Sequence, residues 1–194
     1  MYEYIKRLMD LIIALLALPL LFVLILILGP LIYMEDRGPV FYKSARIGRN
    51  GKRLDMLKFR SMKVNAPDLR NVDGSTFNSR QDARVTKIGR FMRETSIDET
   101  AQLLNVLIGD MSLIGPRAST WDQLDTYKQD EIDKLKVRPG ITGYTQAYFR
   151  NDLSAREKRL KDAWYANNMC FSLDVKIFFK TIKTVLLRKN LYTN

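Results

Sequence analysis

Two adjacent carboxylates, Asp98 and Glu99, stand in the stretch of the sequence that is best suited to chemistry. Ser96 followed by Glu99 matches a helix capping box, so one reading is that Glu99 only closes the start of a helix. Asp98 would then lie at the second helical position, where unpaired N–H groups favour an ionised carboxylate and also attract phosphate. Two such carboxylates suit Mg²⁺, and an ionised Asp can itself attack phosphorus. The spacing alone does not choose among these uses.

Two later segments each place an arginine beside glycine and proline. Arg117 follows Gly115-Pro116, and Arg138 precedes Pro139-Gly140. Glycine and proline fix the backbone and permit close approach, which suits an arginine that clamps a phosphate with two hydrogen bonds. Taken singly, each segment is equally well explained as a turn with a solvated arginine.

The composition narrows the chemistry. The chain has 194 residues and a net charge of +11, which favours an anionic partner such as nucleic acid, an acidic bilayer or a phosphorylated substrate. It contains no histidine, which excludes His-dependent general bases, Ser/His and Cys/His nucleophiles and HExxH zinc sites. A single cysteine, Cys170, excludes an internal disulfide. Catalysis would therefore depend on Asp, Glu, Lys, Arg, Tyr, Ser or a bound metal.

A long uncharged segment, residues 11–33, predicts a membrane anchor over residues 1–36. It is long enough to cross a hydrocarbon core, which needs about 20 apolar residues. The apolar part of a signal peptide is shorter, at about 7–15 residues. A buried core helix would rarely lack a polar face over such a length.

The path of this anchor depends on Pro19 and on the charges that flank it. Lys6 and Arg7 precede the apolar segment, and a heavier basic cluster follows it: Arg37, Lys43, Arg46, Arg49, Lys52 and Arg53. Because positive flanks stay in the cytoplasm, residues 37–194 are predicted to form a cytoplasmic domain. A re-entrant helix that bends at Pro19 would keep both flanks there. A tilted, kinked helix that spans the membrane is the alternative.

The rest of the chain predicts an α+β fold that is mostly helical. Strands at 40–42 and 54–59 form a small β-hairpin around a type I′ turn at Asn50-Gly51. Residues 65–84 form a surface loop, and helices cover 96–108, 120–137 and 153–167. The basic amphipathic helix at 174–189 suits the lipid headgroup region, although an ordinary surface helix has the same pattern.

Taken together and in this order, the segments resemble the monotopic phosphoglycosyl transferases, which are the bacterial sugar transferase family. The resemblance is to the small form of the family, which consists of a membrane anchor and a catalytic domain. The matching parts are the proline-containing anchor, residues 40–42, Lys58-Phe59-Arg60-Ser61-Met62, Arg93 with residues 96–99, and residues 102–107, 109–117 and 137–143.

The resemblance implies the reaction. The family transfers a sugar 1-phosphate from a UDP-sugar to polyprenol (undecaprenyl) phosphate and releases UMP, as the first membrane step of a bacterial glycoconjugate pathway. Asp98 matches the nucleophile that forms an aspartyl-phosphosugar intermediate, and Glu99 matches its partner in a pair associated with Mg²⁺. The residues expected to bind substrate are Lys58, Arg93, Arg117, Arg138, Gln146 and Arg150. The expected location is the cytoplasmic face of the bacterial inner membrane.

The sequence departs from the family pattern in three places. Ala118 replaces the proline that often follows Arg117, and Leu18 replaces the serine before Pro19. Tyr148 and Phe149 replace a small polar pair. If their loop touches the sugar or nucleotide, substrate choice here would be unusual.

Other functional classes explain less of the sequence. A membrane-tethered basic binding or scaffold protein would use the net charge, but the chain has no nucleic-acid-binding motif, so no nucleic-acid partner is predicted. A membrane-remodelling protein would leave Asp98, Glu99 and Arg117 without a role. The sugar, the pathway and any association with itself or with later glycosyltransferases stay open.

Overall fold

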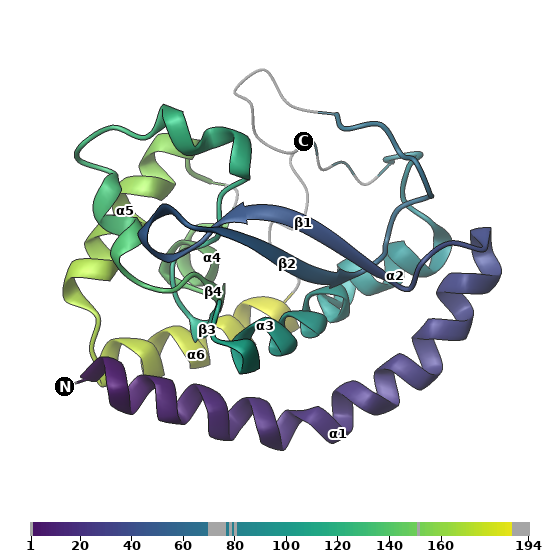
Figure 1. Ribbon diagram of the computed structural model, residues 1–194, viewed down its shortest axis with the longest axis horizontal. Coiled ribbons are helices and arrows are strands. Elements are labelled where there is room, and N and C mark those ends of the chain that lie inside the picture. Colours follow the sequence, from purple (N-terminus) through teal and green to yellow (C-terminus); the bar gives the residue numbers. More distant parts are fainter. Residues whose placement is uncertain (1, 70–76, 78, 80, 151, 188–194) are drawn as a thin grey trace.

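In the computed structural model, which describes residues 2–69, 77, 79, 81–150 and 152–187, one long helix underlies the rest of the chain. This helix, α1 (Tyr2–Asp36), is bowed and continuous, with Pro19 and Pro30 inside it (Figure 1). It is long and apolar enough to cross a membrane. Leu16, Leu20 and Phe22 are at least 60% exposed, whereas Ala14 and Leu21 are buried, so one face of the middle of α1 is uncovered and the other packs on the protein.

Both ends of α1 are fixed to the same body by polar contacts. Near its start, Lys6 Nζ lies 2.5 Å from Asp174 Oδ2. Near its end, Asp36 Oδ1 lies 2.6 Å from the Arg60 guanidinium. Since Lys6 and Arg60 are both buried, these contacts anchor the two ends of the helix and leave its apolar middle exposed between them.

The predicted β-hairpin is present and longer than expected. Strands β1 (Phe41–Ile47) and β2 (Arg53–Phe59) pair antiparallel, joined by the short 3₁₀ turn η1 (Arg49–Gly51). Asn50 and Gly51 both have positive φ, at 57° and 72°, as a type I′ turn requires. The turn signal therefore placed the hairpin correctly.

The helix expected at 96–108 is composite, and the capping-box reading is wrong. Helix α2 (Lys87–Thr95), which was not predicted, ends at Ser96, and the chain then forms the 3₁₀ helix η2 (Ile97–Gln102) and α3 (Leu103–Ile108). Ser96 adopts a left-handed conformation (φ 59°) and its side chain makes no cap hydrogen bond. Its N–H instead donates to Arg93 O, which closes α2. Asp98 therefore sits in a 3₁₀ turn rather than at an α-helix N-terminus.

The amphipathic helix expected at 120–137 is also wrong. Two short 3₁₀ segments occupy this region, η3 (Trp121–Thr126) and η4 (Ile132–Lys136). The buried Glu131 between them accepts hydrogen bonds from Arg156 (2.6 Å) and Arg159 (3.3 Å) of the next helix. These tertiary ion pairs, which local periodicity does not encode, hold the segment in an irregular path.

The remaining elements are two short strands and a short helix that were not predicted, followed by two helices that were. The short strands β3 (Ser112–Ile114) and β4 (Gly140–Thr142) pair in parallel, and α4 (Tyr144–Tyr148), α5 (Ala155–Asn168) and α6 (Phe171–Leu186) follow. The helices α5 and α6 confirm those predicted at 153–167 and 174–189. Residues 70–76, 78 and 80 of the predicted surface loop lie outside the described residues. The division into an anchor at 1–36 and a catalytic domain stays a prediction.

Asn105 ties the hairpin to α3. It is 2% exposed, accepts a hydrogen bond from Leu57 N at Oδ1 (2.9 Å) and donates from Nδ2 to Asp55 O (2.9 Å). Asn105→Leu keeps the size but leaves two strand groups unpaired, so we expect the free energy of unfolding to fall by about 2–4 kcal/mol. Chemical denaturation in detergent measures this loss. Asn168→Leu, at an exposed site, is the control, and an Asn105→Leu variant as stable as that control would contradict the assignment.

Candidate active site

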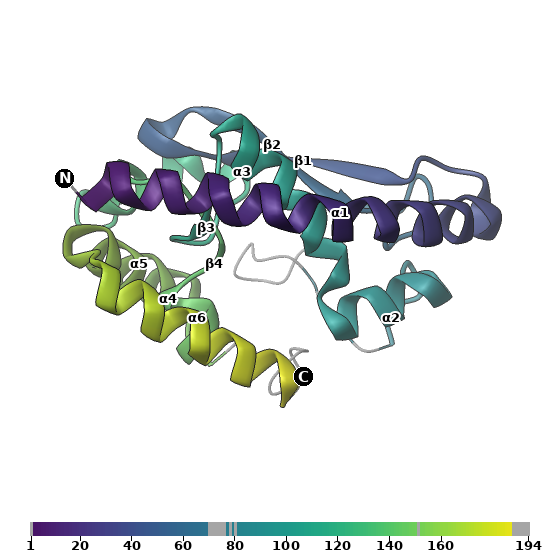
Figure 2. The ribbon, with the colours of Figure 1, turned by 90° about the horizontal axis from the view of Figure 1, so that it is seen from below.

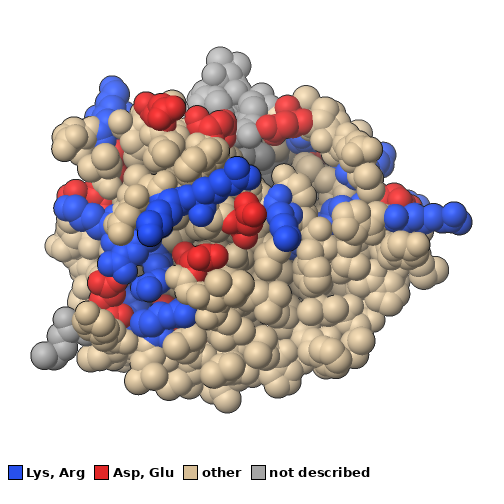
Figure 3. Space-filling model, in the orientation of Figure 1, with Lys and Arg blue, Asp and Glu red and all other residues tan. Residues whose placement is uncertain are grey.

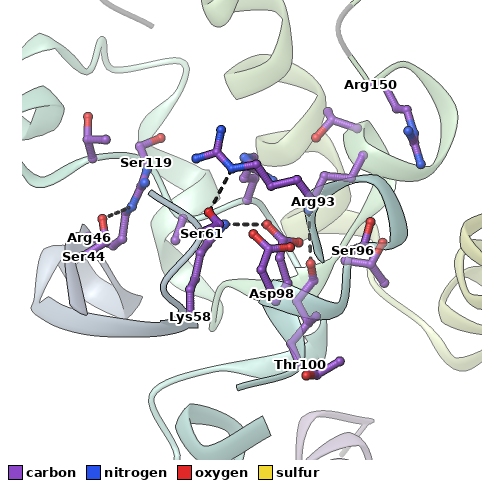
Figure 4. A pocket seen from close by; sticks show the side chains of 18 of the residues that line it. Ser44, Arg46, Lys58, Ser61, Arg93, Ser96, Asp98, Thr100, Ser119 and Arg150 are labelled. Carbon is purple, nitrogen blue, oxygen red and sulfur yellow. Dashed lines mark hydrogen bonds and ion pairs between the residues drawn. The ribbon is translucent and has the colours of Figure 1, made fainter. Parts of the chain in front are cut away.

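Asp98 and Glu99 lie on η2, facing the end of β2 (Figure 4). Asp98 is 7% exposed. Lys58 of β2 places its Nζ 2.6 Å from Glu99 Oε1. A lysine from the hairpin and a carboxylate pair from the helical layer therefore meet, although they are 40 residues apart in the sequence.

The two carboxylates differ in their protonation. Burial raises the pKa of Asp98 to about 6, against the opposing pull of the Lys58 charge, and the neighbouring Glu99 charge raises it further. Burial also acts to raise the pKa of Glu99, but the charges of Lys58 and Arg117 and the hydrogen bond from Lys58 bring it down to about 2. Glu99 is therefore a fixed anion, while Asp98 changes its charge close to neutral pH.

Several arginines converge on this pair from different elements. Arg93, from α2, donates from Nε to Ser61 Oγ (2.9 Å). The Arg93 charge lowers the pKa of Asp98, and the charges of Arg117 and Arg46 lower that of Glu99. The site thus combines two carboxylates with an excess of cations, which suits a polyanionic substrate.

The cavity in front of Asp98 has a volume of about 2320 Å³. Of the eight predicted site residues, seven line it: Lys58, Arg93, Asp98, Glu99, Arg117, Gln146 and Arg150. Gln146 carries a buried Oε1 that has no hydrogen-bond partner among the described residues, so it can accept a hydrogen bond from a ligand.

Arg138 lies elsewhere. Its Nε donates to Gly109 O (2.8 Å), and its guanidinium is 3.8 Å from Glu3 at the start of α1. Its side chain does not line the cavity of Asp98, so the structure does not bring it together with the other predicted substrate-binding residues. The predicted contact between Arg138 and substrate has no support in this geometry.

The sequence reading missed two residues of the site, Arg46 and Ser61. Arg46 lies in β1, where its Nε donates to Ser44 Oγ (2.9 Å) and its charge acts on Glu99. In the sequence it is one of six basic residues after the anchor, so nothing singled it out. Ser61, which orients Arg93, lies in the Lys58 to Met62 segment. Because that segment matches the family, the match could have identified Ser61 as a residue of the site.

The aromatic departure from the family pattern does not reach the cavity. Tyr148 and Phe149 are absent from its lining and pack with Tyr144, which in turn lies 5.1 Å from Trp164 between ring centroids. Lys180 Nζ lies 5.2 Å from the centre of the Tyr148 ring. The unusual pair therefore builds an outer surface, and the expectation of altered substrate choice has no support from the cavity lining.

A divalent cation would find two protein carboxylates here. The part of the chain that the structure describes holds no group of three or more His, Cys, Asp or Glu side chains suited to a metal. Mg²⁺ commonly binds through one or two carboxylates together with substrate phosphates and water. The burial of Asp98 also leaves its charge poorly solvated, which a cation would relieve. The donor set thus fits Mg²⁺ when substrate phosphate is present.

A hairpin lysine, a carboxylate pair and several arginines line one cavity, beside a long helix that is apolar enough to cross a membrane. The sequence matches the bacterial sugar transferase family over residues 1–188, and the chain therefore belongs to that family. The resemblance drawn from the motifs is confirmed.

Individual relatives agree with this membership. The chain is 41% identical over 169 residues to an undecaprenyl-phosphate galactose phosphotransferase of Salmonella typhimurium, covering 81% of this chain and 36% of the relative. It is 39% identical over 191 residues to a UDP-N-acetylgalactosamine-undecaprenyl-phosphate N-acetylgalactosaminephosphotransferase of Aeromonas hydrophila, covering 95% and 44%. The uncharacterized sugar transferase EpsL of Bacillus subtilis is 40% identical over 186 residues, covering 96% and 89%. The chain thus spans less than half of the first two relatives and most of the third.

Proposed function

We propose that this protein transfers a sugar 1-phosphate from a UDP-sugar to undecaprenyl phosphate and releases UMP. The observation that carries the proposal is the buried Asp98 beside the Lys58–Glu99 ion pair, within a cavity lined by arginines. The names of the Salmonella and Aeromonas relatives both support undecaprenyl phosphate as the acceptor, and the Aeromonas name supports a UDP-sugar donor.

The reaction proceeds in two displacements. A carboxylate oxygen of Asp98 attacks the phosphorus that carries the sugar, and the bond from that phosphorus to the oxygen of UMP breaks. An oxygen of undecaprenyl phosphate then attacks the same phosphorus, the bond to Asp98 breaks, and the carboxylate is regenerated. Asp98 is ionised above about pH 6, so it needs no base to activate it, in accord with the absence of histidine.

The other residues act through charge and position. Phosphoryl transfer depends mainly on alignment and on neutralising the oxygens of the transferred group. Lys58, Arg93 and Arg117 supply fixed positive charge on three different elements, and Glu99 holds Lys58 in place. Mg²⁺ held by Asp98 and Glu99 would add a further positive charge to the substrate phosphates.

The experiment is an incubation of the purified protein with a panel of UDP-sugars, with and without undecaprenyl phosphate. We expect one donor to release UMP in both conditions, stoichiometrically without acceptor and catalytically with it. Intact-mass spectrometry should detect the phosphosugar adduct in the absence of acceptor. Failure of every donor to release UMP would overturn the proposal.

We further propose that α1 is re-entrant, with the catalytic domain on the cytoplasmic face of the inner membrane. The ion pairs at both ends of α1, through Lys6 and Asp36, support this path, because a spanning helix would separate its two ends by the thickness of the bilayer. In Figure 3, Lys and Arg gather on the left and in the middle of the face, whereas the lower rim, where the middle of α1 lies, shows no charged side chain. The exposed apolar middle of α1 thus enters the membrane beneath a basic domain.

Cysteine labelling tests the topology. In a Cys170→Ser background, Tyr4→Cys and Tyr42→Cys place single thiols at exposed sites beside the two ends of α1. We expect a membrane-impermeant maleimide to label neither variant in intact spheroplasts and both after lysis. Labelling of the Tyr4→Cys variant from outside would instead support a spanning helix.

A further inference from the structure

The cavity of Asp98 has two chemically different ends. One end is cationic, with Lys58, Arg93 and Arg117 around the carboxylates. The other end lies between α1 and α6 and is lined by apolar side chains. These are Met9 and Ile13 of α1 and Val175, Phe178, Phe179 and Ile182 of α6, which we call the tail channel.

The charged side chains beside the tail channel, Lys6, Asp10 and Asp174, have polar partners within the protein. Lys6 Nζ binds Asp174 Oδ2 at 2.5 Å, and Tyr165 OH donates to Asp174 Oδ1 at 2.6 Å. Asp10 Oδ1 accepts from Leu113 N at 3.0 Å. Lys6, Asp10 and Asp174 therefore already have partners within the protein, and the channel wall offers mainly apolar contact to a ligand.

The tail channel opens towards the face that α1 exposes. Ile13, Phe179 and Ile182 are 45%, 65% and 42% exposed, although they line the same cavity as Asp98. Figure 2 shows that α1 and α6 approach one another near the start of both helices and diverge towards the end of α6. A ligand can therefore reach the carboxylates from the apolar side of the molecule without crossing the basic surface.

We infer that the tail channel holds the first isoprene units of the lipid acceptor, with its phosphate directed towards Asp98. A phosphate head on an apolar chain matches both ends of the cavity, whereas a UDP-sugar is polar throughout and matches one end. Burial of the chain contributes roughly 25 cal/mol per Å² of apolar surface. This inference rests on the proposed function, because it assigns a place to the proposed acceptor.

Photolabelling tests the channel without requiring turnover. The full chain in nanodiscs is irradiated with a polyprenyl phosphate that carries a diazirine on its second isoprene unit. We expect crosslinks at residues 9–13 and 175–182, and we expect undecaprenyl phosphate, but not excess phosphatidylglycerol, to suppress them. Crosslinks elsewhere, or equal suppression by phosphatidylglycerol, would overturn the inference, the latter by indicating a surface for bulk lipid.

Steady-state kinetics of variants that carry a tryptophan in the channel provide the second test. Ile182→Trp and Ile13→Trp place a larger side chain in the channel lining on α6 and on α1, and Leu187→Trp, at the exposed C-cap of α6 and outside the lining, is the control. We expect each channel variant to raise KM about tenfold for undecaprenyl phosphate and less than twofold for a two-isoprene phosphate. UMP release without acceptor should stay unchanged. Equal effects on the KM of both acceptors, or an equal effect of Leu187→Trp, would contradict the assignment of the channel. Absence of acceptor-free UMP release in the wild type would instead contradict the proposed function.

Discussion

Asp98→Asn is expected to abolish sugar-phosphate transfer and, at the same time, to make the protein more stable at neutral pH. The amide cannot attack phosphorus, so neither the covalent adduct nor UMP release should be detectable, a loss of at least about 10⁴-fold in rate. The fold should survive, because asparagine has nearly the same shape as aspartate.

The gain in stability follows from the pKa of Asp98. Burial raises this pKa from 3.8 to about 6 in the folded state, so folding favours the protonated carboxyl. The resulting stability is fully present below pH 3.8 and is lost as the pH rises through about 6. Asparagine stays neutral throughout. At pH 7.5 the variant should therefore be more stable by on the order of 2–3 kcal/mol, and the difference should vanish near pH 4.

Thermal unfolding in detergent across this pH range, paired with the UMP assay, measures both effects. Asp110→Asn, at an exposed position, is the control and should not change the rate. An Asp98→Asn variant that transfers sugar phosphate at the normal rate would remove Asp98 from the nucleophile role. A variant that is inactive but no more stable than wild type would show that ionising Asp98 costs the fold little.

Together, the loss of activity and the gain in stability of Asp98→Asn would show what the burial of Asp98 contributes to the reaction. A carboxylate in bulk water is ionised at a lower free-energy cost. It is also hydrated, however, and this water must leave before the carboxylate can attack phosphorus. The folded protein removes that water in advance and places Lys58 and Arg93 nearby, at the expense of its own stability.

Sequence motifs predicted correctly those elements whose conformation is set by residues close by in the chain. Asn50 and Gly51 predicted the hairpin, because two positive φ angles in succession favour those residues. The capping box at Ser154 and Glu157 is present at the start of α5, where helix 153–167 was expected. In each case, the side chain that determines the structure lies within a few residues of the backbone that it shapes.

Predictions failed where a distant element determines the local structure. Ser96 and Glu99 have the spacing of a capping box, but the end of α2 sets the conformation of Ser96, and Lys58 takes the carboxylate of Glu99. Glu131 is drawn into ion pairs with α5, which replaces the expected amphipathic helix. No periodicity in the sequence reports such contacts.

Most residues of the candidate site were predicted from family motifs that occur in the expected order along the chain. Lys58, Asp98 and Gln146 were matched to family positions, and the fold brings all three to one cavity. Arg138 was grouped with them because it lies beside Pro139-Gly140, but β4 carries the following residues towards Asp98 while the Arg138 side chain turns to α1. The direction of a side chain at a strand end depends on the packing around it, which the sequence motif does not specify.

Lys58→Met should cause the second largest loss, about 10²–10³-fold in rate at pH 7. Lys58 lowers the pKa of both Asp98 and Glu99, and its Nζ lies 2.6 Å from Glu99 Oε1. Without it, both pKa values rise, and less of the nucleophile is ionised at neutral pH. The transferred phosphoryl group also loses one fixed positive charge.

The pH dependence of kcat/KM separates these two effects. In the wild type, kcat/KM should rise with pH as Asp98 loses its proton, with a midpoint at about pH 6, or lower when a bound cation favours the carboxylate. Lys58→Met should move this midpoint upward and also lower the plateau, whereas Lys58→Arg, which keeps the charge, should restore most of the midpoint. Lys52→Met, in the exposed hairpin turn, is the matched control. If Lys58→Met lowered the plateau with an unchanged midpoint, Lys58 would act on the substrate alone; if it changed neither, the Lys58–Glu99 pair would have no part in the reaction.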